Sequence, residues 1–249
     1  MTARPTPSPT PVALDRDDAP FDAEDPTRPQ RAPRPKDAAT LILIRRLPGR
    51  PPEVLMGQRA KGHVFMPDKW VFPGGRVERE DALAPAHVEL TPGTEEALQK
   101  EGCRRKPRAF ALAAVREVFE ETGLVIGRPG GPPGPAPKGW EAYAALNAAP
   151  ELDRLAFIAR AVTPPYRPRR FDARFFMADA EAVLLDDRPI KGDQELLHTE
   201  WFTLDQAFSL DLPNITRFVL GEVTARLAGE ALRPPFLRWT RQGHVMERL

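Results

Sequence analysis

Three glutamates at helical spacing, Glu117, Glu120 and Glu121, carry the clearest chemical signal in this sequence. At about 100° per residue, side chains three and four positions apart lie on the same side of an α-helix, so the three carboxylates share one face. Like charges at this spacing repel one another, and the helix macrodipole disfavours anions near a C-terminus. A cation would offset this cost, and convergent carboxylate oxygens suit the hard ions Mg²⁺ and Mn²⁺. The pattern predicts a metal site, with a solvated acidic helix face as the alternative.

A glycine-rich loop lies upstream of these glutamates, in the segment WVFPGGRVE that contains Gly74 and Gly75. Glycine has no Cβ, which lets the loop turn tightly and approach another group closely. The loop and the segment REVFEETGL together resemble the signature of the Nudix hydrolases. In that signature a Gly is followed after five residues by Glu, and after seven more by Arg-Glu-apolar-x-Glu-Glu-x-x-Gly-apolar. The helix half matches at Arg116 and at all three glutamates, and Gly123 arrives one residue early.

Two departures from the signature concern the stretch between the loop and the helix. Asp81 stands where the pattern has Glu, and the 34 residues 82–115 replace the usual seven. We therefore interpret residues 82–108 as an insertion that splits the signature. A split of this kind resembles the peroxisomal coenzyme A diphosphatase branch of the family and its bacterial relatives. The length of the insertion leaves open whether Asp81 still pairs with Arg116.

The resemblance implies an enzyme that hydrolyses the pyrophosphate bond of a nucleoside diphosphate linked to another moiety. It implies that Glu117, Glu120 and Glu121 hold Mg²⁺ or Mn²⁺, and that Arg116 braces these glutamates. Of these residues, Glu117 and Arg116 are expected to take part in catalysis. Coenzyme A or an acyl-coenzyme A is the expected substrate. Three alternatives stay open: ADP-ribose or NADH as the substrate, hydrolysis of an RNA cap, and a non-catalytic nucleotide-sensing module on the same fold.

Residues outside the helix complete the predicted site. We expect Gly74 and Gly75 to approach the substrate closely through their backbone, and Arg59 to meet its phosphates. The sequence leaves the identity of the general base open, because family members use either a glutamate of the helix or one from a distant loop. The loop candidates here are Glu195 and Glu200, and we favour Glu195. The assignment of a general base must be tested by geometry.

Two further groups of residues have competing interpretations. The segment RRKPR at residues 104–108 is either a solvated charge run, which we favour, or a site for the 3′-phosphate of coenzyme A or an acidic partner. Trp70 and Phe72 flank the glycine loop, and we expect them in the core rather than stacked on a base.

The elements that must position these residues follow from hydrophobic patterning. Short apolar and β-branched runs predict strands, longer periodic segments predict helices, and Gly123 is a natural left-handed cap. Interleaved strands and helices without an internal repeat indicate one α/β or α+β domain. The resemblance implies an α/β/α sandwich with a mixed central sheet. The predicted strands are 40–45, 53–59, 69–72, 155–162, 170–177 and 198–204, and the predicted helices are 109–122 and 212–227.

Prolines mark the expected boundary of this domain. They are concentrated in residues 1–37, where few apolar residues accompany them. Such a segment cannot bury enough surface to offset the entropy of ordering it, so it predicts a disordered tail. Residues 38–249 are then the Nudix domain.

Composition narrows the classes of function. The 36 basic and 35 acidic side chains give a net charge of +1, which argues against a dedicated nucleic-acid binder. A single cysteine excludes an internal disulfide. No apolar stretch approaches the roughly 18 residues of a membrane span, and no secretory signal is evident. We expect a cytoplasmic protein that acts on a nucleotide-type small molecule without contacting a membrane, and the sequence gives no indication of its oligomeric state.

Overall fold

The sheet at the centre of the molecule is mixed. The computed structural model describes residues 10–11, 32–60, 68–100, 105–131, 135–192, 195–240 and 243–249. Within these residues, a 10-stranded sheet has the order β1-β12-β11-β8-β9-β2-β3-β10, and β4 and β5 pair with β3 and β2. The pairs β2–β9 and β8–β11 are parallel. Its other pairs are antiparallel, so the prediction of a mixed sheet is confirmed.

The elements have the following bounds. The strands of the sheet are β1 (Thr10–Pro11), β2 (Lys36–Arg45), β3 (Glu53–Arg59), β4 (Trp70–Val71), β5 (Gly74–Arg76), β8 (Ala156–Val162), β9 (Phe171–Asp179), β10 (Leu196–Thr203), β11 (Pro235–Thr240) and β12 (Gly243–Arg248). A separate pair is formed by β6 (Arg128–Pro129) and β7 (Ala148–Ala149). The helices are α1 (Pro92–Gln99), α2 (Pro107–Thr122), α3 (Glu141–Ala144), α4 (Ala180–Val183), α5 (Leu204–Ser209) and α6 (Asn214–Leu227), with 3₁₀ turns at Glu80–Leu83 and Leu152–Arg154.

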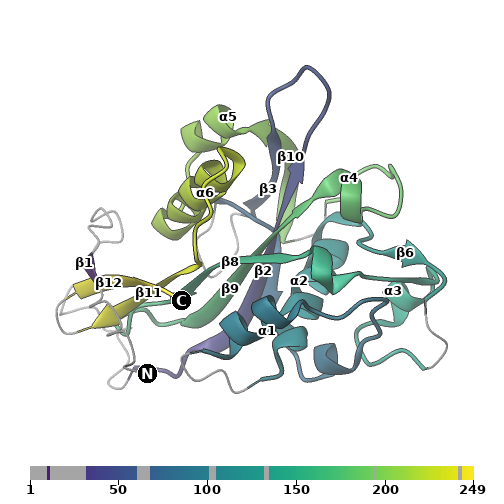
Figure 1. Cartoon of the computed structure of the whole chain (residues 1–249), viewed down its shortest axis with the longest axis horizontal. Coiled ribbons are helices and arrows are strands. Elements are labelled where there is room, and N and C mark those ends of the chain that lie inside the picture. The colour runs from purple at the N-terminus through teal and green to yellow at the C-terminus, as the bar shows by residue number, and fades with distance from the viewer. Residues whose placement is uncertain are drawn as a thin grey trace, which may run out of the picture.

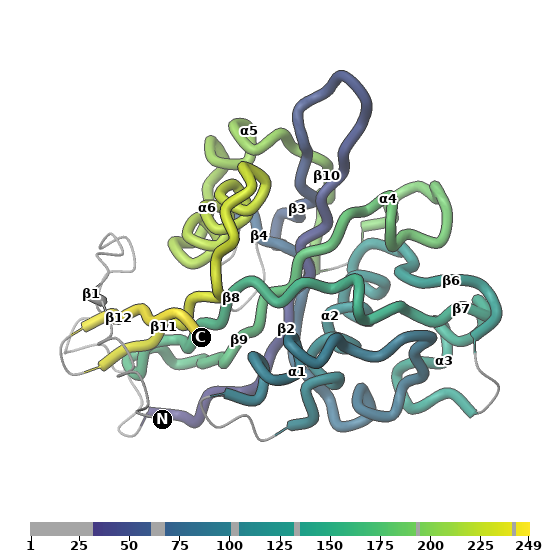
Figure 2. Tube along the Cα trace, viewed as in Figure 1, coloured from purple at the N-terminus to yellow at the C-terminus, as the bar shows by residue number. Residues whose placement is uncertain are grey.

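Helices cover both faces of the sheet, which gives the α/β/α sandwich that the sequence predicts. Figure 1 shows α5 and α6 on one side of the strands and α1 and α2 on the other, and Figure 2 follows the same path as a tube. Successive side chains of a strand point to opposite faces. Accordingly, Leu41 and Leu43 of β2 belong to the core around α2, while Ile42 and Ile44 belong to the core beneath α5 and α6.

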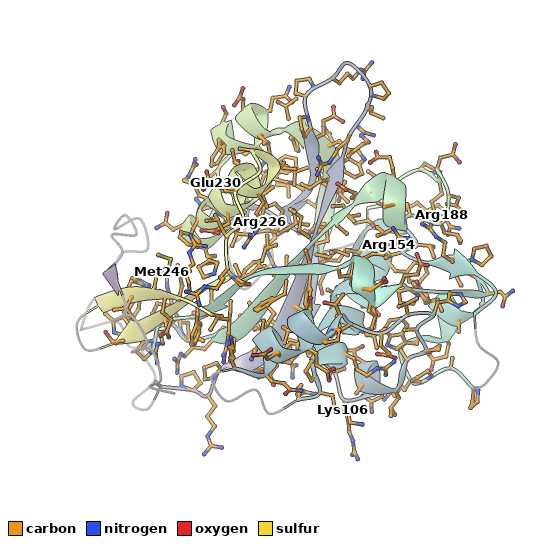
Figure 3. All side chains as sticks on the ribbon, viewed as in Figure 1. Lys106, Arg154, Arg188, Arg226, Glu230 and Met246 are labelled. Atoms are coloured by element: carbon orange, nitrogen blue, oxygen red, sulfur yellow. The ribbon has the colours of Figure 1, made fainter. Side chains whose placement is uncertain are left out.

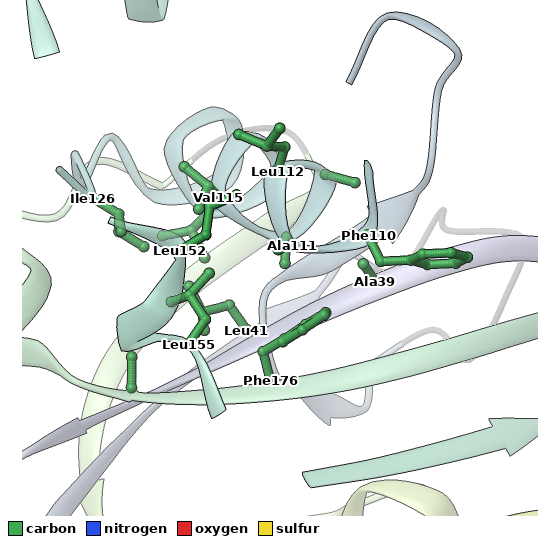
Figure 4. Packing of buried hydrophobic residues seen from close by; sticks show 14 of the residues in the cluster. Ala39, Leu41, Phe110, Ala111, Leu112, Val115, Ile126, Leu152, Leu155 and Phe176 are labelled. Atoms are coloured by element: carbon green, nitrogen blue, oxygen red, sulfur yellow. The ribbon is translucent and has the colours of Figure 1, made fainter. Parts of the chain in front are cut away.

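Helix α2 is held by an apolar stripe that faces the sheet. Phe110, Ala111 and Val115 are fully buried, and they pack in the same cluster as Leu41 and Phe176 of the sheet (Figure 4). The helix starts two residues before the predicted 109–122 because proline is well tolerated in the first helical turn. It ends where predicted, at a left-handed Gly123 with φ 72°. The last two turns therefore carry the acidic residues next to the sheet edge.

The insertion 82–108 folds against α2 in its described part. Its buried side chains, Ala84, Leu90 and Leu98, extend the core cluster that α2 makes with the sheet. The helix α1 begins at a Thr91 cap, whose side chain accepts a hydrogen bond from the Thr94 backbone. The insertion thus contributes to the core.

Two strands include residues of the segment 1–37 predicted as a tail, and the first of them, β1, pairs with β12. β2 begins at Lys36, and its first residues, Lys36 and Asp37, pair with Phe171 and Asp172 of β9. Much of the predicted tail 1–37 lies outside the described residues. No helix in the described part of the chain is long and apolar enough to cross a membrane.

Candidate active site

The glycine loop and the acidic end of α2 are in direct contact. The Gly74 N–H donates to Oε2 of Glu121 at 2.9 Å, and Glu121 is only 4% exposed. A Cβ atom on Gly75 would lie 2.5 Å from the Glu117 carboxylate, so a side chain there would displace that carboxylate. Two glutamates of the helix are therefore positioned by the backbone of the loop. Gly75 leaves space for one of them, whereas a Cβ on Gly74 would lie 2.6 Å from the carbonyl oxygen of Ala39 in β2.

Arg116 lies between two of the glutamates. One terminal nitrogen of its guanidinium is 2.9 Å from Oε1 of Glu117 and 2.8 Å from Oε2 of Glu120. Its Nε donates to Oδ1 of Asp81 at 2.8 Å, and the Arg116 side chain is 8% exposed. The guanidinium is thus shared by three carboxylates and fixes the position of two of them on the helix face.

Asp81 keeps its contact with the helix in spite of the insertion. Besides the bond from Arg116, its carboxylate accepts the Glu78 N–H at 2.8 Å and the Trp140 indole N–H at 3.0 Å. The residue is fully buried. The pairing between Asp81 and Arg116, which the length of the insertion left open, is therefore present. The described residues of the insertion pack against α2 rather than separating the two side chains.

Trp140 is a residue of this network that sequence reasoning missed. It lies 59 positions from Asp81, directly before α3, and its ring packs edge-on against Tyr143 at 5.2 Å. No spacing rule connects the two residues. The one available cue is general: a buried indole N–H needs a hydrogen-bond acceptor.

Two of the helix glutamates, Glu117 and Glu120, have raised pKa values. Burial raises the pKa of Glu117 to about 7; Arg116 opposes this shift and the charge of Glu120 adds to it. Burial also raises the pKa of Glu120, again opposed by Arg116. One guanidinium therefore does not compensate the buried negative charge fully, and an additional cation would stabilise the ionised forms.

Metal binding must be judged from the chemistry of these donors. Among the described residues, no three His, Cys, Asp or Glu side chains converge on one point as a metal cage does. Glu120 is hydrogen-bonded to Arg116, and Glu121 to the loop backbone. Even so, Glu117, Glu120 and Glu121 offer the oxygen donors that Mg²⁺ and Mn²⁺ prefer, within one turn of helix. The donor set fits such an ion.

Arg59, the last residue of β3, faces the same carboxylates. Burial lowers its pKa, and the negative charges of Glu121, Glu195 and Glu117, in decreasing order of effect, oppose that change. A guanidinium beside an acidic cluster is well placed to meet a phosphate that a metal holds on the same cluster.

The two loop glutamates differ in position. Glu195 is exposed, directly before β10, and its charge reaches both Arg59 and Glu120. Glu200 is also exposed but lies further along β10, opposite Met56 of β3. The structure thus brings Glu195 to the carboxylate cluster.

The basic segment 104–108 is not a solvated charge run in its described part. Arg105 donates to Asp37 at 3.0 Å, and Arg108 pairs with Glu89 at 2.9 Å. Lys106 is exposed and projects from the lower edge of the molecule in Figure 3. The interpretation that we favoured is therefore wrong for both arginines: Arg105 fastens the insertion to β2, and Arg108 ties Glu89 to the first turn of α2.

Trp70 and Phe72 belong to the core on the α6 side of the sheet, as predicted. Phe72 is 4% exposed. Trp70 is partly buried and meets the Phe202 ring edge-on at 5.0 Å.

Comparison with known proteins gives the class that this fold and site define. The chain is 34% identical over 136 residues to the acyl-coenzyme A diphosphatase NUDT19 of Gallus gallus, a match that covers 41% of this chain and 36% of that protein. It is 28% identical over 217 residues to NUDT19 of Homo sapiens, with 64% and 57% covered. A solved NUDIX hydrolase from Alicyclobacillus acidocaldarius aligns over 78% of this chain and 95% of its own, at 29% identity and a TM-score of 0.57.

No family model matches the chain. Sequence and fold are nevertheless both similar to those of Nudix hydrolases. The chain covers only 36% and 57% of the two curated relatives, so the activity in their names describes those proteins.

Proposed function

We propose that this protein is a metal-dependent hydrolase that cleaves the pyrophosphate bond of a nucleoside diphosphate linked to another moiety, with an acyl-coenzyme A or coenzyme A as its substrate. The observation that carries the proposal is the contact between Gly74 and Gly75 and the glutamates of α2, with Arg116 between Glu117 and Glu120. The substrate class is supported by the acyl-coenzyme A diphosphatase relatives.

The metal would be held by Glu117, Glu120 and Glu121. When bound, Mg²⁺ or Mn²⁺ supplies positive charge against the phosphate oxygens and lowers the pKa of a bound water. Arg116 keeps two of the carboxylates in place while their charge is shared with the ion.

The remaining residues bind the substrate and accept the proton. Arg59 would donate to a phosphate oxygen of the diphosphate, and the backbone of Gly74 and Gly75 would lie beside that group. We assign the proton acceptor to the carboxylate of Glu195, because it is the exposed acid that reaches both Arg59 and Glu120. A cytoplasmic location stays a prediction.

Mass spectrometry of the products tests this proposal. Purified protein with Mg²⁺ or Mn²⁺ is offered coenzyme A, an acyl-coenzyme A, ADP-ribose, NADH and a capped dinucleotide in parallel. We expect 3′,5′-ADP and a 4′-phosphopantetheine product to form fastest. Glu120→Gln should reduce that rate by at least 100-fold, since charge stabilisation of this kind is typically worth ~10²–10³.

Glu200→Gln is the matched control, because it removes an exposed acid of β10 that lies apart from the cluster. Faster cleavage of ADP-ribose or NADH would keep the metal chemistry and reject the coenzyme A assignment. No turnover of any compound, with Mn²⁺ still bound, would favour the nucleotide-sensing alternative.

A further inference from the structure

A cavity of about 210 Å³ opens directly beside the candidate active site. It shares three lining residues with that site, Arg59, Gly74 and Gly75. From there it crosses the sheet on the face that α6 covers, and the N-terminal end of α6 borders it at Ile215 and Thr216. We call this cavity the transverse cleft.

The floor of the transverse cleft is open because its central residues are small. Ala38 of β2 lies in register with Ala173 of β9, which in turn lies in register with Ala161 of β8. All three alanines line the cleft. Side chains in register on neighbouring strands point to the same face, so three methyl groups in a row leave a channel that larger residues would fill.

The walls of the channel are mainly apolar. Val71, Phe72 and Phe175 line it near the glycine loop, and Leu237 of β11 lines it at the far side. From β5 through β2, β9 and β8 to β11 there are four strand steps. At about 4.8 Å per step, the channel spans ~19 Å.

The far end of the cleft has a different lining. His244 of β12 borders it and meets the Trp239 ring edge-on at 4.7 Å, and Trp239 is 39% exposed. Arg167 and Arg169 also border the cleft. Imidazole and guanidinium side chains therefore line the cleft in addition to its apolar residues.

We propose that the transverse cleft binds the acyl-pantetheine arm of the substrate, called the acyl arm here: its pantetheine part leaves the diphosphate site at Gly75, and its acyl chain lies towards Leu237. This inference rests on the proposed function, because it takes the diphosphate to lie at the glycine loop. The apolar floor and walls favour methylene groups, whose removal from water is the main gain on binding. The acyl arm is the part of the substrate that such a channel selects.

Filling the cleft at its centre tests the inference. The measured quantity is the ratio of kcat/KM for octanoyl-coenzyme A to that for coenzyme A, because the two substrates share the scissile bond and differ only in the acyl chain. Ala173→Phe places a ring on the floor of the channel, and we expect the ratio to fall at least tenfold. Ala156→Phe makes the same change at an exposed position of β8 outside the cleft, and should leave the ratio as it is.

A smaller substitution and a direct binding measurement test the same inference if Ala173→Phe does not fold. Ala173→Val adds two carbon atoms at a strand position that tolerates β-branched residues, and should lower the ratio by a smaller factor. Octanoyl-pantetheine has no pyrophosphate bond, so calorimetry with it reports the channel alone. We expect it to bind the wild-type chain and the Ala156→Phe variant at least tenfold more tightly than Ala173→Phe.

The outcomes separate this inference from the proposed function. If acyl-coenzyme A is hydrolysed but neither Ala173 variant changes the ratio or the affinity for octanoyl-pantetheine, the cleft does not hold the acyl arm. If no pyrophosphate is cleaved while octanoyl-pantetheine binds and Ala173→Phe abolishes that binding, the cleft assignment stands and the proposed activity fails.

Discussion

The two ends of the candidate site are built in different ways. At the α2 end, buried charges are held by specific partners: Asp81 by Arg116 and Trp140, and Glu121 by the backbone of Gly74. In the transverse cleft, the shape comes from the sizes of side chains such as Ala173. The first end depends on complete pairing, because an unpaired buried charge is costly. The second depends on empty volume, which many sequences can provide.

This difference separates the chemistry from the selectivity. Residue types are tightly constrained where carboxylates must be brought to one loop, and the reaction class can be inferred from them. Channel dimensions are set by alanines and by Leu237, residues that look like any others in a core. Changes at the α2 end should therefore affect folding and all substrates, whereas changes in the cleft should affect only the choice among substrates.

Removal of Arg116 is expected to have the largest effect on stability. Arg116→Met keeps much of the side-chain volume but leaves Asp81 buried without its cation. Breaking a buried ion pair from one side typically costs ~3–5 kcal/mol. We expect a loss of that size in the free energy of unfolding, measured by urea denaturation.

The matched control is Arg188→Met. Arg188 also forms an ion pair, with Asp186 at 2.6 Å, but in a more exposed position. Pairs near the surface contribute little, so the free energy of unfolding should change by less than about 1 kcal/mol. If the free energy of unfolding falls by the same small amount in both variants, the α2 end does not depend on buried ion pairs. The contrast between the two ends would then be wrong.

Trp140→Phe is expected to have an intermediate effect. Phenylalanine retains an aromatic ring beside Tyr143 but removes the N–H that donates to Asp81. A buried acceptor that loses one charge-assisted bond costs roughly 1–3 kcal/mol. We expect a decrease of that size in the free energy of unfolding.

Trp239→Phe is the comparison for this variant, because Trp239 is a partly exposed tryptophan of β11. Surface substitutions usually change stability by less than about 0.5 kcal/mol. Equal decreases in the free energy of unfolding of the two variants would mean that the hydrogen bond from the Trp140 indole N–H to Asp81 does not stabilise the fold.

The sequence predicts the α2 end better than the cleft for a physical reason. The spacing of Glu117, Glu120 and Glu121 reports helix geometry directly, and the end of α2 at Gly123 follows from local backbone preference. The partner of Asp81 could not be found in this way. Trp140 lies 59 positions from Asp81 in the sequence, and tertiary packing brings the two side chains together. No local sequence pattern predicts such a contact.

The same reasoning explains two errors at the level of the fold. The segment 104–108 looks like a solvated charge run because composition does not show that Asp37 and Glu89 will lie opposite its arginines. The strand β2 begins at Lys36, earlier than the apolar run at residue 40 indicates, because pairing with β9 extends it through polar residues. Pairing partners that are remote in sequence decide both outcomes.

Gly75→Ala should have the smallest effect on stability. This variant bears on both ends of the site, because Gly75 lies against Glu117 and also lines the transverse cleft. The added Cβ would lie 2.5 Å from the Glu117 carboxylate, which is the flexible end of a side chain and can move away. We therefore expect the free energy of unfolding to change by less than about 1 kcal/mol. The displaced carboxylate should weaken Mn²⁺ binding, measured by electron paramagnetic resonance, by at least tenfold. Gly93→Ala, where no atom lies within 4 Å of the added Cβ, should change neither quantity. Unaltered Mn²⁺ affinity in Gly75→Ala would mean that Glu117 does not hold the metal in the position that the loop gives it.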